Sequence, residues 1–521
     1  DNTMIDLGFD LKPVKGLVIS GQGAFKGWES KSRGYTALQD NVKNFETGAE
    51  IPGTGVYTNE MNMFWQSENR TMYTLTARYD WSNKVHNIGI LAGTSYEHYK
   101  YERLYAKWKD FVTDDLEDMT TGGEISKDQP DQNSYGTPLR EYKILSYFGR
   151  LNYSLLDRYL FEANLRADAS SRFHKDNRWG IFPSFSAGWV LSEEAFMENA
   201  DINWLSFLKL RASYGTLGNE RITDKDGNAL YYPYQAFINF SDVLFYQNGT
   251  VVPELSAAQW AYAVENISWE TTSSVDIGLD ANFFNNRLRF TADYYNKQTK
   301  DMLLALEIPD YVGFDNPQRN TGKMYTNGYD IELAWNDRIG DLTYGISANF
   351  SDFISKMGDL GGTEFLGDQV KLKDSEFNEW YGYLSDGLML TEEDLKGPKL
   401  NDNVQLGDVK YKDISGPDGV PDGKISPEYD RVLLGGSLPR FQYGGTLNLG
   451  YKGFDFSVAI QGVGRRNTRL SSAMVQPLQA NWGNTPAIID GKYWSEKNTE
   501  AQNAEAIYPR LTYSNNSINY A

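Results

Sequence analysis

Residues 275–295 read VDIGLDANFFNNRLRFTADYY, and this stretch decides the fold class. Apolar residues occupy every second position over 275–283, with polar or small residues between them. After Asn285-Asn286 the alternation resumes over 288–294. A period of two is typical of a β-strand whose two faces meet different surroundings. One face has almost no charge, and the other carries carboxylates, amides, Arg and Gly. The pattern therefore predicts a hairpin between lipid and a watery lumen.

The same two-faced pattern recurs along the chain as a series of hairpins. It predicts strands near residues 5–11, 17–26, 71–80, 86–96, 143–153, 159–167, 181–191, 206–216, 275–283, 288–294, 329–335, 342–350, 441–449 and 454–460. These are about fourteen strands of roughly ten residues, each long enough to cross a bilayer when tilted. Short turns alternate with long polar loops, the longest over 352–438. This asymmetry is the plan of outer-membrane barrels, with short periplasmic turns and long extracellular loops.

Composition excludes several other classes of protein. The 521 residues include 14% aromatics and 48 Gly, but no run of about 18 apolar residues of the kind that a membrane helix needs. There is no Cys, which excludes disulfides, thiolate metal sites and a Cys nucleophile. A net charge of −20 argues against a nucleic-acid partner. Three His, without an HExxH motif or a nucleophile elbow, give catalysis little support, so we do not expect an enzyme.

Periodicity alone leaves one alternative open, a large soluble β-sandwich or β-helix whose apolar face is its core. Two observations favour the membrane. The polar faces are rich in Gly and Asn as well as charge, and the turn asymmetry persists through seven hairpins. The fold predicted is therefore all-β, a transmembrane antiparallel β-barrel.

Several segments resemble signatures of the SusC/RagA family of TonB-dependent outer-membrane transporters of Bacteroidota. The blocks that carry the resemblance are RADASSRF at 166–173, NRWGIFPS at 177–184, LKLR at 208–211, SYGTLGN at 213–219, WET at 269–271, DIGLD at 276–280 and GDVKYKD at 407–413. They stand in the family's order over nearly the whole chain. Ordered blocks of this length are far more specific than one short motif.

The resemblance implies a 22-stranded barrel, of which about fourteen strands are present here, with a lumen wide enough to need a plug. It also implies a location in the outer membrane and a SusD-like lipoprotein over the outer mouth. Oligosaccharides or peptides would be imported with TonB as the energy source. We expect 1–464 to form barrel strands and loops, and 465–521 to form an extracellular loop region leading to missing C-terminal strands. The N-terminal plug and the TonB-binding segment are expected to be absent from this chain.

Aromatic residues of the predicted long loops are candidates for contact with substrate or lid. Flat rings beside Asn, Asp and Gln stack on sugars, but they also pack loops together or dock proteins, and a packing role is the more common one for any single residue. The candidates are Trp65, Tyr101, Tyr105, Trp108, Tyr231, Tyr234, Trp260, Trp380, Tyr381, Tyr383 and Trp482. A charged strand end is marked by Arg166, Asp168 and Arg172. These residues could contact the plug or the substrate, and the simpler alternative is that they pair with one another.

The loop over 408–431 is a candidate calcium site. Asp413, Asp418, Asp422 and Glu428 offer oxygens around two Asp-Gly turns, and Ca²⁺ takes six to eight oxygen ligands. The spacing does not match an EF-hand, and a pair of metal-free Asp-Gly turns is the alternative. No other cofactor is expected.

Three functions are compatible with this reading. The first is nutrient import by the barrel of a SusC-like transporter. The second is a non-transporting barrel that anchors a surface adhesion or assembly complex. The third is a secreted β-rich glycan-binding protein, which extraction without detergent would reveal.

Overall fold

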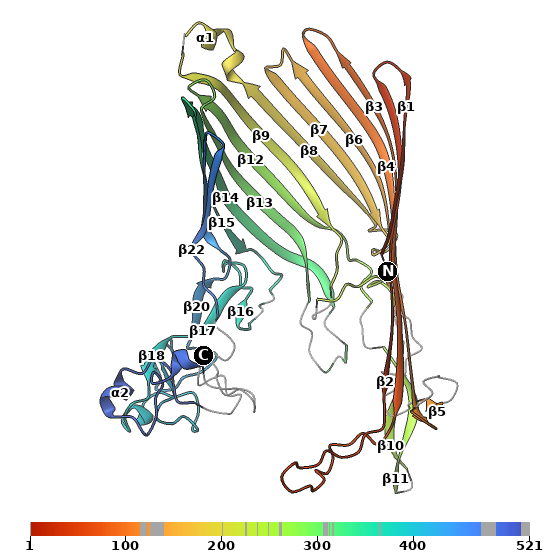
Figure 1. Cartoon of the computed structure of the whole chain (residues 1–521), viewed down its shortest axis with the longest axis vertical. Helices are drawn as coiled ribbons and strands as arrows, with labels where there is room; N and C mark the ends of the chain where they lie inside the picture. Colours follow the sequence, from red (N-terminus) through yellow and green to blue (C-terminus); the bar gives the residue numbers. More distant parts are fainter. Residues whose placement is uncertain are drawn as a thin grey trace. The chain divides into compact units, whose positions relative to one another are not determined.

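The fold was analysed in a computed structural model (Figure 1). The structure describes residues 2–114, 122–125, 140–200, 202–223, 227–236, 238–247, 249–259, 263–305, 311, 313–314, 317–362, 364, 366–469 and 486–511. Contacts divide the chain into two compact units. Unit 1 comprises 1–201, 209–275 and 301–320, and unit 2 comprises 202–208, 276–300 and 321–521.

One large antiparallel sheet dominates the described residues, with neighbouring strands in the order β1-β2-β3-β4-β6-β7-β8-β9-β12-β13-β14-β15-β21-β22. These strands are β1 (Asn2–Val14), β2 (Leu17–Thr36), β3 (Glu60–Ser82), β4 (His86–Phe111), β6 (Arg140–Leu155), β7 (Tyr159–Ser170), β8 (Trp179–Val190), β9 (Leu205–Asn219), β12 (Glu270–Phe283), β13 (Leu288–Ala305), β14 (Gln318–Ile339), β15 (Leu342–Met357), β21 (Arg440–Tyr451) and β22 (Phe454–Arg465). All fourteen predicted strands are therefore present, and the all-β prediction is confirmed.

Smaller elements lie in the long connections. β5 (Gly122–Ile125) pairs with β4, and β10 (Asn239–Gln247) pairs with β11 (Thr250–Ala258). The connection after β15 holds one sheet of β16 (Gln369–Val370), β17 (Glu379–Tyr383) and β20 (Arg431–Gly436), and another of β18 (Ser385–Leu388) and β19 (Val409–Tyr411). Helices are short: η2 (Leu191–Glu193), α1 (Ala195–Glu198), η4 (Asp394–Lys396), η5 (Ala487–Ile489) and α2 (Glu500–Ala504). In the described part of the chain, no helix is long and apolar enough to cross a membrane.

The main sheet has two unlike faces, which the strand register defines. Tyr147 lies opposite Ala167, and Ala167 lies opposite Ile181, so these apolar residues share what we call the outer face. Arg166 and Asp168 lie on the other, inner face. The outer side chains are not packed against a second sheet, because Leu165 is 54% exposed and Ile181 is 66% exposed. In water this would be unfavourable, so the outer face indicates contact with hydrocarbon.

A shallow apolar groove runs over the outer face of unit 1, lined by residues that include Leu151, Phe161 and Phe185. Its lining comes from the alternate apolar positions of β6, β7 and β8, together with neighbouring strands. Since it lies on the side that meets hydrocarbon, we assign this groove to lipid contact rather than to a soluble ligand.

Several strands extend well beyond their predicted ends. Residues 27–70 were expected to hold a loop of about forty residues, but β2 runs on to Thr36 and β3 begins at Glu60. Likewise, β4 continues to Phe111, well past residue 96. Beyond the bilayer both faces of a strand meet water, so the alternation disappears while the backbone hydrogen bonds continue. The prediction was wrong there for that reason.

The short turns lie at the predicted places and adopt left-handed backbone conformations. Gly16, between β1 and β2, has a φ of 88°, while Asn285 and Asn286 have φ of 57° and 63°. Gly and Asn tolerate this region best, which explains their use in tight hairpins. In unit 1 the turns of β1–β2 and β3–β4 lie at one end of the strands, and β5 and the β10–β11 hairpin lie toward the other (Figure 1).

Aromatic side chains gather beside the short turns. In unit 1, the rings of Tyr159 and Trp189 stack at 6.5 Å. In unit 2, Trp204 stacks on Phe283 at 5.8 Å, and Phe284 lies 6.1 Å from Trp335. Amphipathic rings at the turn ends of the strands match the interfacial girdle that the sequence predicted.

Candidate functional site

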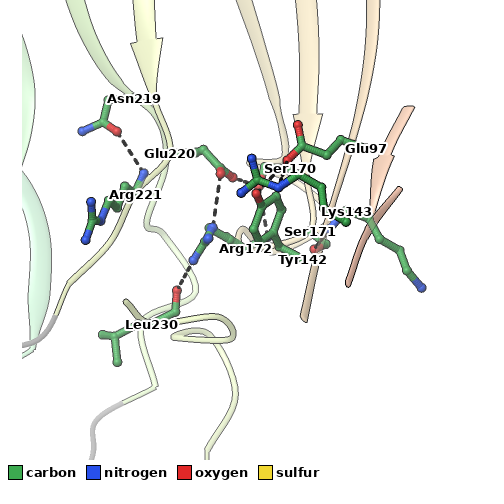
Figure 2. Close-up of polar contacts among 11 residues, drawn as sticks. Glu97, Tyr142, Lys143, Ser170, Ser171, Arg172, Asn219, Glu220, Arg221 and Leu230 are labelled. Atoms are coloured by element: carbon green, nitrogen blue, oxygen red, sulfur yellow. Dashed lines mark hydrogen bonds and ion pairs between the residues drawn. The ribbon is translucent and has the colours of Figure 1, made fainter. Parts of the chain in front are cut away.

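A buried arginine organises the inner face of unit 1 where β7 ends (Figure 2). Arg172 is only 5% exposed. Its Nε donates to Glu220 Oε1 at 3.2 Å, and its Nη1 donates to the carbonyl of Leu230 at 2.8 Å. Ser170 Oγ donates to the other oxygen of Glu220. Because a buried charge is costly unless it is paired and hydrogen-bonded, these partners account for the position of the guanidinium.

Two tyrosine rings, whose centres lie 6.4 Å apart at an interplanar angle of 21°, both contact the same guanidinium. The Arg172 guanidinium carbon lies 4.5 Å from the ring centre of Tyr142 and 4.6 Å from that of Tyr231. Tyr142 also stacks on Tyr99 at 5.1 Å, and its hydroxyl donates to Glu97 Oε1 at 2.7 Å. Desolvated cation–π contacts of this kind are worth about 2 kcal/mol each. The arrangement fixes the loop that carries Tyr231 to the wall formed by β4 and β6.

Part of this cluster could be found from the sequence. Strand alternation places Glu97 and Tyr99 of β4 on the inner face, together with Tyr142 of β6. Arg172 belongs to the block RADASSRF. Nothing in the sequence pattern identified Glu220 as a member of this cluster. Its pairing with Arg172 depends on how the loop after β9 returns to the end of β7.

An apolar cluster lies close to the arginine. Phe173 follows Arg172 and is fully buried with Ile222 and Ile267, beside the largely buried Trp269. The rings of Phe173 and Trp269 lie 5.4 Å apart. Two adjacent residues therefore hold the connection between β9 and β12 against the sheet. Arg172 does so through polar contacts and Phe173 through apolar packing.

The other charged residues predicted at this strand end are also paired. Arg166 Nε donates to both carboxylate oxygens of Asp168 at 2.8 and 2.9 Å, and Arg166 Nη2 donates to Ser146 Oγ at 2.8 Å. The guanidinium also lies 5.4 Å from the ring centre of Phe148. These contacts fit mutual pairing of the charged residues, which is the simpler alternative to contact with plug or substrate.

Four of the candidate aromatic residues belong to strands of the main sheet rather than to loops, which corrects the prediction. Trp65 lies in β3, while Tyr101, Tyr105 and Trp108 lie in β4. The reason is the extension of these strands beyond the alternating region. Trp65 Nε1 donates to Glu29 Oε1 at 2.7 Å, and Tyr101 accepts a guanidinium contact at 5.4 Å. Each of these two rings makes a local packing or hydrogen-bonding contact.

The remaining described candidates fall into two separate groups. Tyr231 belongs to the arginine cluster, and the hydroxyl of Tyr234 lies 3.4 Å from the carbonyl of Ser171, to which it donates. Trp380, Tyr381 and Tyr383 are neighbours on β17 in unit 2. Burial raises the pKa of Tyr383, which packs at 5.2 Å on Tyr411. Trp260 and Trp482 lie outside the described residues.

The acidic loop over 408–431 is organised by Asp430, which is fully buried. Its carboxylate accepts backbone N–H bonds from Ile414 at 2.8 Å, Ser415 at 3.3 Å and Ser426 at 2.7 Å. Burial alone would raise the pKa of Asp430, but these bonds outweigh it and hold the pKa below its usual range. The carboxylate of Asp430, which the sequence also places among the oxygens of this loop, is therefore already engaged by backbone N–H groups.

The four candidate calcium ligands are Asp413, Asp418, Asp422 and Glu428. Asp413 accepts the N–H of Gly423 at 2.7 Å, and its other oxygen is buried. Within the described part of the chain, no three His, Asp or Glu side chains gather as a metal site would require. Calcium binding by this loop therefore stays a prediction. It would require the bound ion to draw the carboxylates closer together.

That hypothesis predicts calcium binding by the full-length protein in detergent. Sites of extracellular modules bind Ca²⁺ with Kd of about 10⁻⁴–10⁻³ M, and Asp422→Asn should weaken binding about tenfold by removing a charged ligand. Isothermal titration with CaCl₂ measures this. The control is Asp402→Asn, because Asp402 is a fully exposed carboxylate whose Oδ1 lies 3.7 Å from Lys399 Nζ. Equal titration curves for the unmodified protein and the two variants would show that this loop does not bind calcium.

A polar pocket lies between β18, β19 and the segment after α2, all within unit 2. Lys410 Nζ donates to Asp394 Oδ1 at 2.7 Å. The other oxygen of Asp394 accepts N–H bonds from Leu390 at 3.1 Å and Thr391 at 2.9 Å. The bond from Lys410, followed by those from Thr391 and Leu390, lowers the pKa of Asp394 to about 2.

The pairing of Asp394 with Lys410 makes the stability of this region depend on pH. Because the pKa of Asp394 is lower in the folded state, its stabilisation is present above about pH 4 and is lost as pH falls toward 2. Asp394→Asn should destabilise the segment 385–411 by about 1–2 kcal/mol at neutral pH. Hydrogen exchange of this segment in the full-length protein should show the difference at pH 7 and its loss near pH 2. Glu393→Gln, at an exposed pair with Lys396, should change little at either pH.

Known proteins were compared with this chain. The family described as TonB dependent receptor-like, beta-barrel, matches residues 1–458. TonB-dependent receptor P26 of Formosa agariphila is 31% identical over 411 residues, which are 76% of this chain and 38% of that protein. TonB-dependent receptor P3 of the same organism is 29% identical over 447 residues, 82% of this chain and 42% of the relative. TonB-dependent receptor SusC of Bacteroides thetaiotaomicron is 30% identical over 341 residues, 64% of this chain and 32% of SusC.

Solved structures agree with the fold. The structure of the RagAB peptide transporter has a TM-score of 0.75 and 22% identity, covering 98% of this chain and 52% of that chain. At this identity the likeness establishes the fold. The chain spans 42% of the length of P3 and 38% of that of P26, so it corresponds to part of such a receptor.

The two-faced antiparallel sheet and its inward polar cluster define an outer-membrane β-barrel wall. The chain belongs to the TonB-dependent receptor β-barrel family. This is a family of outer-membrane receptors and transporters rather than of enzymes.

Proposed function

We propose that this chain forms part of the wall and outer loops of a TonB-dependent nutrient importer of the outer membrane. The substrate would be an oligosaccharide or a peptide, captured together with a SusD-like lipoprotein that covers the outer mouth. The lid would open, the ligand would be held between loops and lid, and TonB would then displace the plug. The plug and the TonB-binding segment are not assigned to any residue described above.

One observation carries this proposal: the main sheet exposes apolar side chains on one face and polar ones on the other. The outer face of β7 and β8 presents Leu165, Ile181 and Phe185, all more than half exposed. The inner face presents paired charges such as Arg166 with Asp168. A wall with these two sides separates hydrocarbon from a polar lumen, as import through a barrel requires.

The partner and the substrate class are supported by the names of relatives. SusC of Bacteroides thetaiotaomicron is called a TonB-dependent receptor, and the RagAB structures are described as a peptide importer with open and closed states. A two-component importer with a moving lid is the assembly that we propose for this chain. The aromatic residues of β17, with Tyr231 and Tyr234, are the proposed contacts for substrate or lid, and Trp260 and Trp482 are proposed on the sequence alone.

The proposal is tested on the full-length protein in its own cell. We expect the protein to fractionate with the outer membrane, to require detergent for extraction, and to co-purify with a SusD-like lipoprotein. Growth on the imported nutrient should be lost when either this gene or tonB is deleted, and restored by the intact gene. Separate binding measurements with oligosaccharide and peptide pools would identify the substrate class.

The alternatives give different results in the same experiment. A non-transporting anchor would fractionate with the outer membrane, but its deletion would leave uptake unchanged and no SusD-like protein would co-purify. A soluble glycan-binding protein would be recovered in buffer without detergent. Either result would refute the importer.

A further inference from the structure

The outer face of unit 1 holds an uncharged band that ends at a fixed height above the short turns. No Asp, Glu, Lys or Arg occupies an outer position within the fully described ranges 17–27, 71–81, 86–96 and 145–155. With a rise of about 3.3 Å per residue and a tilt near 45°, a hydrocarbon band about 25 Å tall spans roughly eleven residues. Aromatic rings lie near the upper end of this band, where Tyr73 is 58% exposed and Tyr147 stacks on Trp179 at 6.0 Å.

Ionisable side chains begin on the same face where the band ends. They start twelve residues from the turn ends of β2, β4 and β6, at Glu29, His98 and Lys143. Strand register places Lys100 opposite Glu141 and His98 opposite Lys143, so these four residues form one patch. The set that we call the outer belt comprises Glu29, Lys31 and Arg33 on β2, His98, Lys100 and Glu102 on β4, and Glu141 and Lys143 on β6.

Each lysine of the outer belt pairs with a carboxylate two residues away on its own strand. The Nζ–Oε1 distances are 3.1 Å for Lys31–Glu29, 2.7 Å for Lys100–Glu102 and 3.1 Å for Lys143–Glu141. In each pair the lysine is the more exposed side chain, at 75% against 50%, 39% against 33% and 50% against 20% in the same order. The carboxylates therefore orient the lysines while the ammonium groups stay accessible. Since exposed pairs of this kind contribute little to stability, folding alone does not explain the arrangement.

We propose that the outer belt binds the phosphorylated headgroups of lipids in the outer leaflet of the membrane. The inference rests on the proposed orientation of the barrel, with its long connections outside, but it does not depend on import. Headgroups lie directly beyond the hydrocarbon, which is the height at which the outer belt begins. An ammonium group presents three donors to phosphate oxygens, and clustered Lys and Arg beside a membrane bind anionic headgroups.

The side of the sheet favours a lipid over a ligand inside the barrel. Glu97 and Tyr99 lie on the inner face, beside the Arg172 cluster, so His98 and Lys100 between them face the opposite way. The charge of the belt favours an anion. Four Lys and Arg side chains accompany three carboxylates there, although the whole chain has a net charge of −20.

The test is native mass spectrometry of the full-length receptor in nonionic detergent, with added lipid A, a phosphorylated glycolipid of bacterial outer leaflets. The variant carries Lys100→Gln and Lys143→Gln. The control carries Lys12→Gln and Lys26→Gln, two exposed lysines outside the belt, of which Lys12 lies near a short turn and Lys26 lies on the inner face. We expect the variant to retain at least about fivefold less lipid A, and the control to stay within about twofold of the unmodified receptor.

Further arms identify the chemistry of the ligand. Dephosphorylated lipid A should bind the unmodified receptor at least about fivefold less, and Lys100→Arg/Lys143→Arg, which keeps both charges, should bind lipid A normally. An excess of inorganic phosphate should leave lipid A bound, and displacement by phosphate would overturn the proposal, because the belt would then bind free anions.

The remaining outcomes separate this proposal from the proposed function. Equal retention of lipid A by the Lys100→Gln/Lys143→Gln variant and the unmodified receptor overturns the lipid site and leaves the importer intact. Equal binding of phosphorylated and dephosphorylated lipid A does the same, as does an equal loss in the arginine and glutamine variants. A receptor that is extracted without detergent refutes the barrel and the proposed function together.

Discussion

Leu151→Lys is expected to destabilise the full-length receptor in lipid by about 2–4 kcal/mol, the cost of a cationic side chain facing hydrocarbon near the bilayer centre. Leu151 lies on the outer face of β6, opposite Ile90 and Ala163, and is 45% exposed. With a rise of about 3.3 Å per residue and a tilt near 45°, Leu151 stands roughly 12 Å along the bilayer normal from the turn that follows β6. That is close to the middle of an apolar band about 25 Å tall.

The adjacent residue supplies the matched control. Asn152 lies on the inner face beside Glu162, so a lysine there meets water and a carboxylate. Asn152→Lys should therefore change the free energy of unfolding by less than about 0.5 kcal/mol. Urea unfolding of both refolded variants in lipid bilayers measures the difference. Equal costs for the two substitutions would show that the outer face does not meet hydrocarbon, and the barrel assignment would fail with it.

Arg172→Ala is expected to have the second large effect, about 3–5 kcal/mol, because it removes the buried cation that pairs with Glu220, whose side chain is only 18% exposed. The guanidinium also contacts the rings of Tyr142 and Tyr231, so its loss removes both cation–π contacts and leaves a cavity beside the rings. We expect the connection over 220–234 to detach from the wall and to be cleaved by protease at least tenfold faster in the full-length protein.

Two further variants separate the possible causes. Arg221→Ala removes the same charge from an exposed neighbour of Glu220 and should leave the cleavage rate within twofold. Glu220→Gln keeps the hydrogen-bonding shape and should cost less than Arg172→Ala, since no unpaired carboxylate remains. Wild-type protease resistance in Arg172→Ala would show that the cluster does not hold the connection in place.

The sequence alone determined the strand positions and their two faces. Alternation in 275–283 and its repeats identified all fourteen strands of the main sheet, because the pleat sends successive side chains to opposite sides and each side meets a different solvent. Turn residues such as Asn285-Asn286 were equally readable, since few residues tolerate their left-handed conformation. Strand ends beyond the bilayer were not readable, because water on both faces removes the alternation.

The tertiary structure alone decided which distant residues meet. Arg172 pairs with Glu220, 48 positions away, and contacts Tyr142 through a strand order that local patterning does not contain. The aromatic candidates also needed the fold, because a ring on an extended strand and a ring on a loop have the same sequence signature. Local sequence fixes the direction of each side chain on a strand, but loop closure and strand pairing fix its neighbours. Loop closure and strand pairing are long-range properties of the whole sheet.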